Sequence, residues 1–310
     1  MKSHGKTFSL LSVCFIAVTT STAFAQAGAT TGKCAFQTLN FPPPANHGGP
    51  VALNDVGAIL GSFSNFQIHG FLLYQGKLTT FMFPGSANTR ASDISRNGNI
   101  VGSYDVNNAA GFSETHPFIV QAGGFHEITL PGFPNAQATA AGVNANGDVV
   151  GVIFSQTAEP GPGYLLHNGK LTQLSFPGAT GGTQPASIND QGVVVGTYFI
   201  SSQVDRSFGF MWKAGVFSNI NPPDGIAFSR TQVTKISNSG VVVGDYVSAD
   251  ERVHGFAFEN GTYTKIDVPG FQDAFILGVN KFDNVVAQAQ QQTQTGQKIA
   301  EVKGFCAAAF

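Results

Sequence analysis

Charged side chains are scarce in this sequence. Of its 310 residues, 16 are Lys or Arg and 18 are Asp or Glu, which makes 11% of the chain, whereas globular proteins average about 25%. The basic residues form no cluster and the formal net charge is -2, so nothing indicates binding to nucleic acid or to an anionic membrane. The chain is nevertheless 42% hydrophobic, which excludes a charge-rich disordered protein.

Long apolar runs are also missing. The longest, from Phe8 to Val18, is shorter than the roughly 20 residues that a membrane-spanning helix needs. It follows two lysines and precedes Ala23-Phe24-Ala25, a pattern typical of a secretory signal peptide. We therefore predict a signal peptide at residues 1–25, cleaved between Ala25 and Gln26, a flexible N-terminus at 26–33 and a single domain at 34–310, with no membrane span. The protein should be secreted, periplasmic or on the cell surface.

Cysteine occurs three times, and one of the three, Cys14, lies in the predicted signal peptide. The mature chain would keep Cys34 and Cys306, at its two ends. In an oxidising compartment such a pair is typical of a disulfide, and two buried free thiols are the alternative.

Glycine and phenylalanine are abundant instead, with 38 and 28 copies, and both follow an internal repeat. One signature is an apolar residue, Asn or Ser, two variable residues, Gly, and an apolar run closed by Gly. Its copies are LNDVGAILGSF from Leu53, ISRNGNIVGSY from Ile94, VNANGDVVGVI from Val143, INDQGVVVGTY from Ile188, ISNSGVVVGDY from Ile236, and a degenerate VNKFDNVVAQA from Val279. Their spacing averages about 45 residues, which is typical of propeller blades.

Two further signatures accompany each copy. The first is a Gly-aromatic step such as His69-Gly70-Phe71, for which we assign Lys303-Gly304-Phe305 as the sixth copy. The second is a run ending in Pro-Gly, such as KLTTFMFPG from Lys77. The sixth such run is missing at the C-terminus, and an equivalent, Ala35 to Pro42, precedes the first repeat.

This displaced copy predicts a closed ring. Each repeat is read as four short strands separated by Gly and Asn turns, which gives an all-β, six-bladed β-propeller. Its N-terminal strand would complete the C-terminal blade and place Cys34 beside Cys306. An open solenoid would show capping repeats instead, so we favour the ring. Small residues should line the axis, Phe should fill the space between blades, and Gln288 to Gln297 should form an exposed loop.

The repeat units resemble those of a bacterial extracellular repeat group called the HAF family, after a His-Ala-Phe signature. Gly replaces Ala here, as in His69-Gly70-Phe71 and His254-Gly255-Phe256. The resemblance covers about residues 34 to 310 and implies a secreted or surface protein with a propeller-like fold. It brings no catalytic residues.

Candidate binding residues lie where the repeat symmetry breaks, because loops on a rigid scaffold commonly carry function. We single out the asymmetric acidic residues Asp105, Glu114, Asp205 and Asp224. Trp212 and an exposed Tyr164 could stack on a sugar, although aromatic residues at repeat positions are more often part of the core. His69, His116 and His254 share one repeat position and should point apart, which favours packing over a metal site. No cofactor, metal or nucleophile motif is indicated.

The sequence therefore favours a monomeric, non-catalytic binding or scaffold protein with an unknown extracellular ligand, either a polysaccharide or a protein. The alternative is an extracellular hydrolase or lyase that acts on polysaccharide. An enzyme of that kind requires two carboxyl groups roughly 5 to 10 Å apart, one with a raised pKa.

Overall fold

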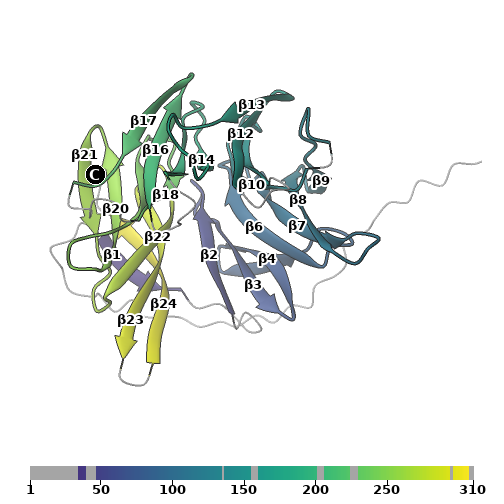
Figure 1. The fold of residues 1–310 in the computed structure, drawn as a ribbon. Helices are drawn as coiled ribbons and strands as arrows, with labels where there is room; N and C mark the ends of the chain where they lie inside the picture. Colours follow the sequence, from purple (N-terminus) through teal and green to yellow (C-terminus); the bar gives the residue numbers. More distant parts are fainter. Residues whose placement is uncertain are drawn as a thin grey trace, which may run out of the picture.

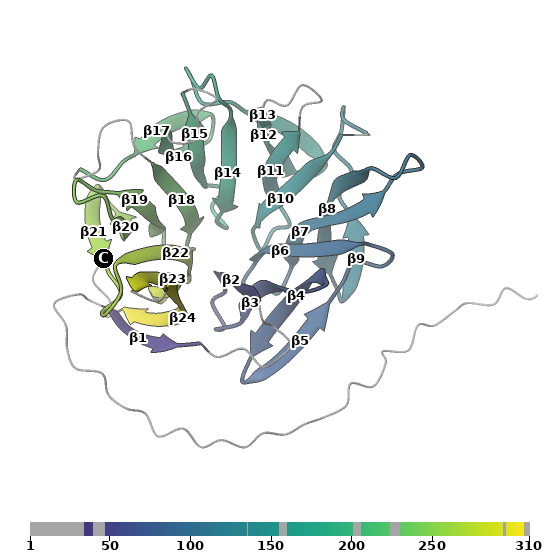
Figure 2. The same cartoon turned by 60° about the horizontal axis from the view of Figure 1, so that its bottom comes forward.

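The computed structural model describes residues 34–39, 47–134, 136–154, 160–200, 206–223, 230–293 and 296–306. In these ranges the chain forms 24 strands and no helix. The strands make six antiparallel four-stranded sheets, which stand as blades around a central axis (Figures 1 and 2). The six-bladed β-propeller is thus confirmed, whereas the predicted signal peptide and residues 26–33 lie outside the described residues.

Each blade is a meander of consecutive strands, apart from the last. Blade 1 is β2 (His47–Leu53), β3 (Ile59–Asn65), β4 (Gln67–Tyr74) and β5 (Lys77–Phe81), and blade 2 is β6 (Asn88–Ile94), β7 (Ile100–Asn107), β8 (Ser113–Gln121) and β9 (Gly124–Glu127). Blade 3 is β10 (Ala138–Val143), β11 (Val149–Phe154), β12 (Pro160–His167) and β13 (Lys170–Leu174), and blade 4 is β14 (Thr183–Ile188), β15 (Val194–Phe199), β16 (Ser207–Lys213) and β17 (Val216–Ile220). Blade 5 is β18 (Thr231–Ile236), β19 (Val242–Val247), β20 (Val253–Glu259) and β21 (Thr262–Ile266). Blade 6 is β22 (Asp273–Val279), β23 (Asn284–Thr293), β24 (Gly296–Cys306) and the N-terminal β1 (Cys34–Thr38).

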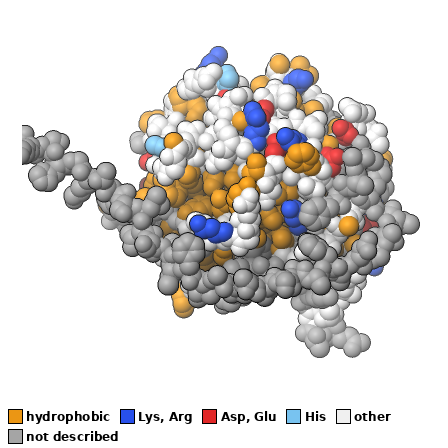
Figure 3. Space-filling model, turned by 180° about the vertical axis from the view of Figure 1, so that it is seen from behind, with side chains coloured by type: hydrophobic (Ala, Val, Ile, Leu, Met, Phe, Trp, Pro, Cys, Tyr) orange, Lys and Arg blue, Asp and Glu red, His pale blue; other side chains and the backbone are white. Residues whose placement is uncertain are grey.

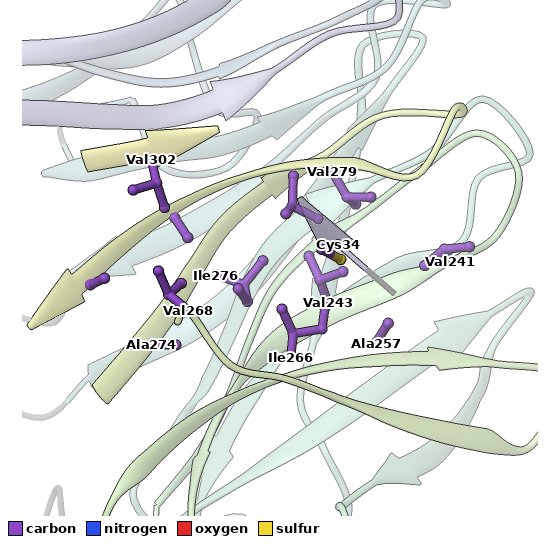
Figure 4. Close-up of a cluster of buried hydrophobic side chains, with 13 residues drawn as sticks. Cys34, Val241, Val243, Ala257, Ile266, Val268, Ala274, Ile276, Val279 and Val302 are labelled. Carbon is purple, nitrogen blue, oxygen red and sulfur yellow. The ribbon is translucent and has the colours of Figure 1, made fainter. Parts of the chain in front are cut away.

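The ring closes as the displaced repeat predicts. Strand β1 pairs antiparallel with β24, with Cys34 opposite Cys306 and Thr38 opposite Val302. Cys34 is buried in an apolar cluster between blades 5 and 6 that includes Val243, Ile276 and Val302 (Figure 4). The two ends of the chain are therefore held in one sheet by backbone hydrogen bonds and by apolar packing.

The first strand of every blade lines the axis (Figure 2). Each of these strands has a register shift between the third and the first residue before its end, which is between Pro50 and Ala52 in blade 1. A bulge turns the following side chain out of the regular alternation. The residues after the shift are Ala52, Asp93, Gly142, Ser187, Lys235 and Gly278.

The closing glycine of the repeat is required by packing. In blade 2, a Cβ on Gly102 would lie 2.0 Å from the carbonyl oxygen of Arg90 and 2.9 Å from the ring of Phe118. Phe118 pairs with Gly102 in the register and is fully buried. Blades 1, 3, 4 and 5 repeat this arrangement with Phe71, Tyr164, Phe210 and Phe256. The prediction that Phe fills the interior is confirmed.

The sixth copy differs from our assignment. Ala287 stands in place of the glycine, and its partner in the register is Val302, whereas Gly304 pairs with Val285. The structural equivalent of the Gly-aromatic step in blade 6 is therefore Glu301-Val302. Our assignment of Lys303-Gly304-Phe305 as the sixth copy was wrong. A Cβ at residue 287 leaves less room for a ring, and the smaller Val302 occupies that place.

The Gln-rich segment is also different from the prediction. Residues 288 to 293 belong to β23 and residues 296 and 297 to β24, so most of the expected loop is a hairpin. This hairpin extends beyond the rest of blade 6 (Figure 1). Pairing along both strands, from Gln288 with Glu301 to Thr293 with Gly296, satisfies the backbone groups that a loop would leave to water.

Candidate functional site

The two ends of the ring carry different turns, because a meander places alternate turns at opposite ends. We call the end with the turns between second and third strands the loop face. The other end, with the turns between first and second strands, is the turn face. Asp105 and Glu114 lie on β7 and β8 of blade 2, toward the loop face, whereas Asp205 and Asp224 lie outside the described residues.

Asp105 is buried and fully engaged. Its Oδ2 accepts hydrogen bonds from Arg90 Nη1 at 2.7 Å and Asn88 Nδ2 at 3.1 Å, and its Oδ1 accepts one from Thr115 Oγ1 at 3.0 Å. Burial acts to raise the pKa of Asp105, but these hydrogen bonds outweigh it and hold the pKa below its usual value. Asp105 is thus an internal anchor and does not present its carboxylate to a ligand.

Hydrogen bonds through Asp105 join three blades. Asn88, which donates to Asp105, also accepts from the Ile68 N–H of blade 1 at 3.0 Å. On the other side, the Thr115 N–H donates to Gln137 Oε1 at 3.3 Å, ahead of β10 of blade 3. The Phe154 N–H then donates to the Gln137 carbonyl at 2.8 Å. The loop-face ends of blades 1, 2 and 3 are therefore connected by one continuous polar network.

Each of these three blade ends exposes a phenylalanine. Phe66 is 105% exposed, Phe112 70% and Phe154 42%. Phe66 also has a φ of 61°, a left-handed conformation that is a genuine outlier for a bulky residue. Leaving an aromatic ring exposed to water is unfavourable. A strained backbone conformation persists only where the surrounding structure holds it, and such strain is common at functional sites. This part of the loop face is a candidate site.

Glu114 stabilises the turn that carries Phe112. Asn108 Nδ2 donates to Glu114 Oε1 at 2.9 Å, and Asn108 Oδ1 accepts from the Ala110 and Phe112 N–H groups at 3.0 Å each. The turn is thereby closed by a side chain as well as by its backbone. The sequence identified the right hairpin, but its acidic residues shape the hairpin, and the exposed ring was not singled out.

An aromatic and acidic cluster lies behind this hairpin. The ring of Tyr104 stacks on Phe83 at 3.8 Å and on His116 at 5.5 Å. His116 lies between Glu127, at 3.6 Å, and Glu114, at 3.8 Å. Burial and the neighbouring Glu127 raise the pKa of Tyr104 to about 12, so the phenol stays neutral. The His position packs on an aromatic ring here and in blade 1, where His69 stacks on Phe63.

The axis of the ring is occupied by an ion pair. Lys235 Nζ of blade 5 lies 3.0 Å from Asp93 Oδ1 of blade 2 and donates to the Ser92 carbonyl at 3.1 Å. Asp93 also accepts from the Ile94 and Val143 N–H groups. Both charged side chains are buried. Blades 2 and 5 are opposite in a six-membered ring, so the pair spans the axis.

Two aspartates connect the blades at the turn face. Asp190 of blade 4 accepts from Arg96 Nε of blade 2 at 2.6 Å and from the Ala145 N–H of blade 3 at 2.8 Å. Asp55 of blade 1 accepts from the Lys281 N–H of blade 6 at 2.9 Å and from Asn238 Nδ2 of blade 5 at 3.2 Å. The hollow between these residues and Lys235 has a volume of about 40 Å³, room for about three water molecules.

Blade 5 carries buried charge near the loop face. Arg230 Nη2 and Asp245 Oδ1 form an ion pair, and burial, only partly offset by Arg230, raises the pKa of Asp245 to about 6. His254 is buried, with Nδ1 at 2.6 Å from Asp267 and Nε2 at 3.1 Å from Asp250. The hydrogen bond from Ser248, followed by that from His254, lowers the pKa of Asp250. Sequence reasoning identified the position of His254 but not its carboxylate partners.

The two aromatic candidates for sugar stacking are not equivalent to the exposed phenylalanines. Tyr164 is fully buried, with its hydroxyl donating to the Thr139 carbonyl at 3.0 Å, so the prediction that it is exposed was wrong. Trp212 is half-buried and packs against the cluster of Leu165 and Phe210. Tyr164 occupies the repeat position of Phe118, which explains its burial.

In the described part of the chain, no cluster of three or more His, Cys, Asp or Glu side chains is arranged to hold a metal ion. The same residues include no helix long and apolar enough to cross a membrane. One side of the molecule shows acidic and basic side chains next to one another in small groups, with hydrophobic side chains between them (Figure 3).

Comparison with known proteins identifies the fold alone. No family model matches the sequence, and no curated protein does. A protein of unknown function from Dyadobacter fermentans is 11% identical and aligns over 88% of this chain and 99% of its own with a TM-score of 0.52. An acylaminoacyl peptidase from Pyrococcus horikoshii is 10% identical and aligns over 79% of this chain but 41% of its own, with a TM-score of 0.52. A putative TolB from Agrobacterium tumefaciens is 11% identical over 84% of this chain and 83% of its own, with a TM-score of 0.46.

Proposed function

We propose that this chain is an exported, non-catalytic binding or scaffold protein. The observation that carries the proposal is the closure of the axis by Lys235 and Asp93, with a hollow of only about 40 Å³ above them. Small-molecule sites are usually clefts of about 300 to 1,000 Å³. Binding would therefore use an outer surface of the ring, on a frame held rigid by hydrogen bonds between blades.

The carboxyl groups also support binding over hydrolysis. Asp93, Asp55 and Asp190 near the axis each accept hydrogen bonds from a cation, an amide or backbone N–H groups. Asp245 has the raised pKa expected of a general acid, but it is 2% exposed and paired with Arg230. The pKa of Asp283 is raised by burial and by Glu259, in a tight turn at the opposite face from the exposed phenylalanines.

Export, the disulfide and the family are parts of the same proposal. The N-terminal pattern of Lys2, Lys6 and the apolar run supports cleavage between Ala25 and Gln26. The register that places Cys34 opposite Cys306 supports a disulfide at the closure of the ring. The repeat signatures support membership of the HAF group of extracellular proteins, and a monomer is expected.

The test is to express the full sequence in a bacterial host and isolate the exported protein. Intact mass spectrometry should show loss of residues 1–25. The purified protein should release neither reducing ends nor unsaturated sugars from a panel of polysaccharides. Release of either product by the purified protein, but not by an identically prepared fraction from cells without it, would overturn the non-catalytic proposal.

A further inference from the structure

Among the described residues of the loop face, blades 1, 2 and 3 differ from blade 5. Blades 1 and 2 expose Phe66 and Phe112 between their second and third strands, and blade 3 exposes Phe154 at the end of its second strand. The corresponding turn of blade 5 contains Asp250, Glu251 and Arg252 instead. Single exposed apolar residues are ordinary, but exposed rings near the loop-face end of three consecutive blades indicate a surface with a role.

The network through Asp105 fixes these rings relative to one another. Ile68, two residues after Phe66, is bonded to Asn88, and Phe154 is bonded to the Gln137 carbonyl. Asn108, held by Glu114, closes the turn that carries Phe112. Preorganised groups lose less conformational entropy on binding, so rigid rings favour a ligand that contacts all three blades.

The groups around the rings indicate the chemistry of the ligand. Amide side chains flank them in exposed positions, namely Asn65, Gln67, Asn107 and Gln137. Amides both donate and accept hydrogen bonds, as sugar hydroxyls do. Arg90 is paired with Asp105, so this surface offers no unpaired cation among its described residues that would attract an anionic lipid or an acidic polymer.

A partner protein fits this surface less well than a polysaccharide. Protein interfaces have a contiguous apolar core with a polar rim, whereas here the three exposed rings belong to three different blades, with exposed amide residues on the same blades. An extended chain of sugars alternates apolar C–H faces with hydroxyl groups. Stacking on rings and hydrogen bonding to amides along one direction matches that alternation.

We propose that the loop face of blades 1 to 3 binds a neutral polysaccharide chain, with Phe66, Phe112 and Phe154 as stacking platforms and the flanking amides as hydrogen-bond partners. This inference rests on the proposed binding function and adds its surface and its ligand class.

Affinity electrophoresis in gels containing barley β-glucan, xyloglucan or galactomannan tests this inference. Alginate, polygalacturonate and phosphatidylcholine vesicles are the comparison probes. The wild-type protein should be retarded by at least one neutral polysaccharide. Phe66→Ala, Phe112→Ala and Phe154→Ala should each weaken that retardation about tenfold, and the triple variant should abolish it. Phe282→Ala is the matched control, because Phe282 is 58% exposed on the turn face.

Three results would overturn the inference: no binding to any neutral polysaccharide, binding to the anionic polymers or vesicles alone, or unchanged affinity of a folded triple variant. Thermal unfolding establishes that each variant is folded. Unchanged affinity in the triple variant would leave the proposed binding function intact and place it on another surface. Release of sugar products would instead overturn the proposed function itself.

Discussion

Lys235 and Asp93 meet across the axis of the ring, with Nζ 3.0 Å from Oδ1. They occupy the same repeat position, where the other four blades have Ala52, Gly142, Ser187 and Gly278. The same two blades also replace the repeat's Asn by Ser, at Ser95 and Ser237. Opposite blades have thus acquired complementary charges at a position that is otherwise small, and the axis is closed as a result.

Removing one partner of this pair should destabilise the fold strongly. Lys235→Met leaves Asp93 buried without its cation, and we expect a loss of about 3 to 5 kcal/mol in the free energy of unfolding, measured with urea. The double variant Lys235→Met, Asp93→Asn should recover at least half of it. Arg96→Met, which removes a half-exposed ion pair to Asp190, is the control and should cost less than about 1 kcal/mol. Equal losses for the two single variants would contradict the role of the axial pair.

Asp245 should make stability fall as pH rises. Its pKa is about 6 in the folded protein against an ordinary value of 3.8, so between about pH 4 and 6 the folded state holds a proton that the unfolded state releases. The free energy of unfolding should decrease across this window by on the order of 2 kcal/mol. Asp245→Asn should remove this decrease from the pH profile. A variant profile parallel to that of the wild type would contradict the assignment.

The closing glycines should tolerate no side chain. Gly102→Ala would place a Cβ 2.0 Å from the Arg90 carbonyl oxygen, and we expect a loss of about 3 kcal/mol or failure to fold. The reverse change at the equivalent place in blade 6, Ala287→Gly, should cost about 1 kcal/mol. Thermal unfolding of the two variants compares them directly. A stable Gly102→Ala protein would show that the glycine is not required by packing.

Asp283 should be replaceable with a gain in stability. In the turn between the first and second strands, blades 1 to 5 have a glycine of positive φ. Blade 6 has Asp283 at that place, with a φ of 59°. Its Oδ1 is buried without a hydrogen-bond partner among the described residues, and its pKa is raised. Asp283→Gly should therefore raise the free energy of unfolding by about 1 kcal/mol at neutral pH.

The matched control for Asp283 is Gly98→Asp. Gly98 has a φ of 87° and open space where a Cβ would lie, so only the backbone conformation opposes a side chain there. The Gly98→Asp variant should lose about 1 kcal/mol in its free energy of unfolding. A loss of stability in Asp283→Gly would indicate that the carboxylate has an interaction of its own.

The closure of the ring should be covalent in the exported protein. Non-reducing peptide mapping should recover Cys34 linked to Cys306. Cys34→Ser should lower the free energy of unfolding by roughly 5 kcal/mol, because the disulfide would close a loop of nearly the whole domain. Two thiols that react with iodoacetamide in the native protein would rule the disulfide out.

Local patterns in the chain were sufficient for the architecture. The repeat of Asn or Ser, Gly and a closing Gly determined the number of blades, their four-strand meander and the split sixth copy, because turn chemistry and close packing act within about 45 residues. Blade 6 is the instructive failure. Ala287 and Val302 lie opposite each other, and an alignment by glycine placed Gly304 there instead, because register depends on the paired strand and not on one motif.

The candidate site was decided in three dimensions. Asp105 was chosen from sequence as a candidate binding residue, whereas the fold buries it at the centre of a hydrogen-bond network over three blades. Phe66, Phe112 and Phe154 belong to three repeats and lie on the same face only because the ring places their blades side by side. Lys235 and Asp93 are more than 140 residues apart in the chain. Their attraction depends on burial and on a distance of 3.0 Å, which only the closed ring provides.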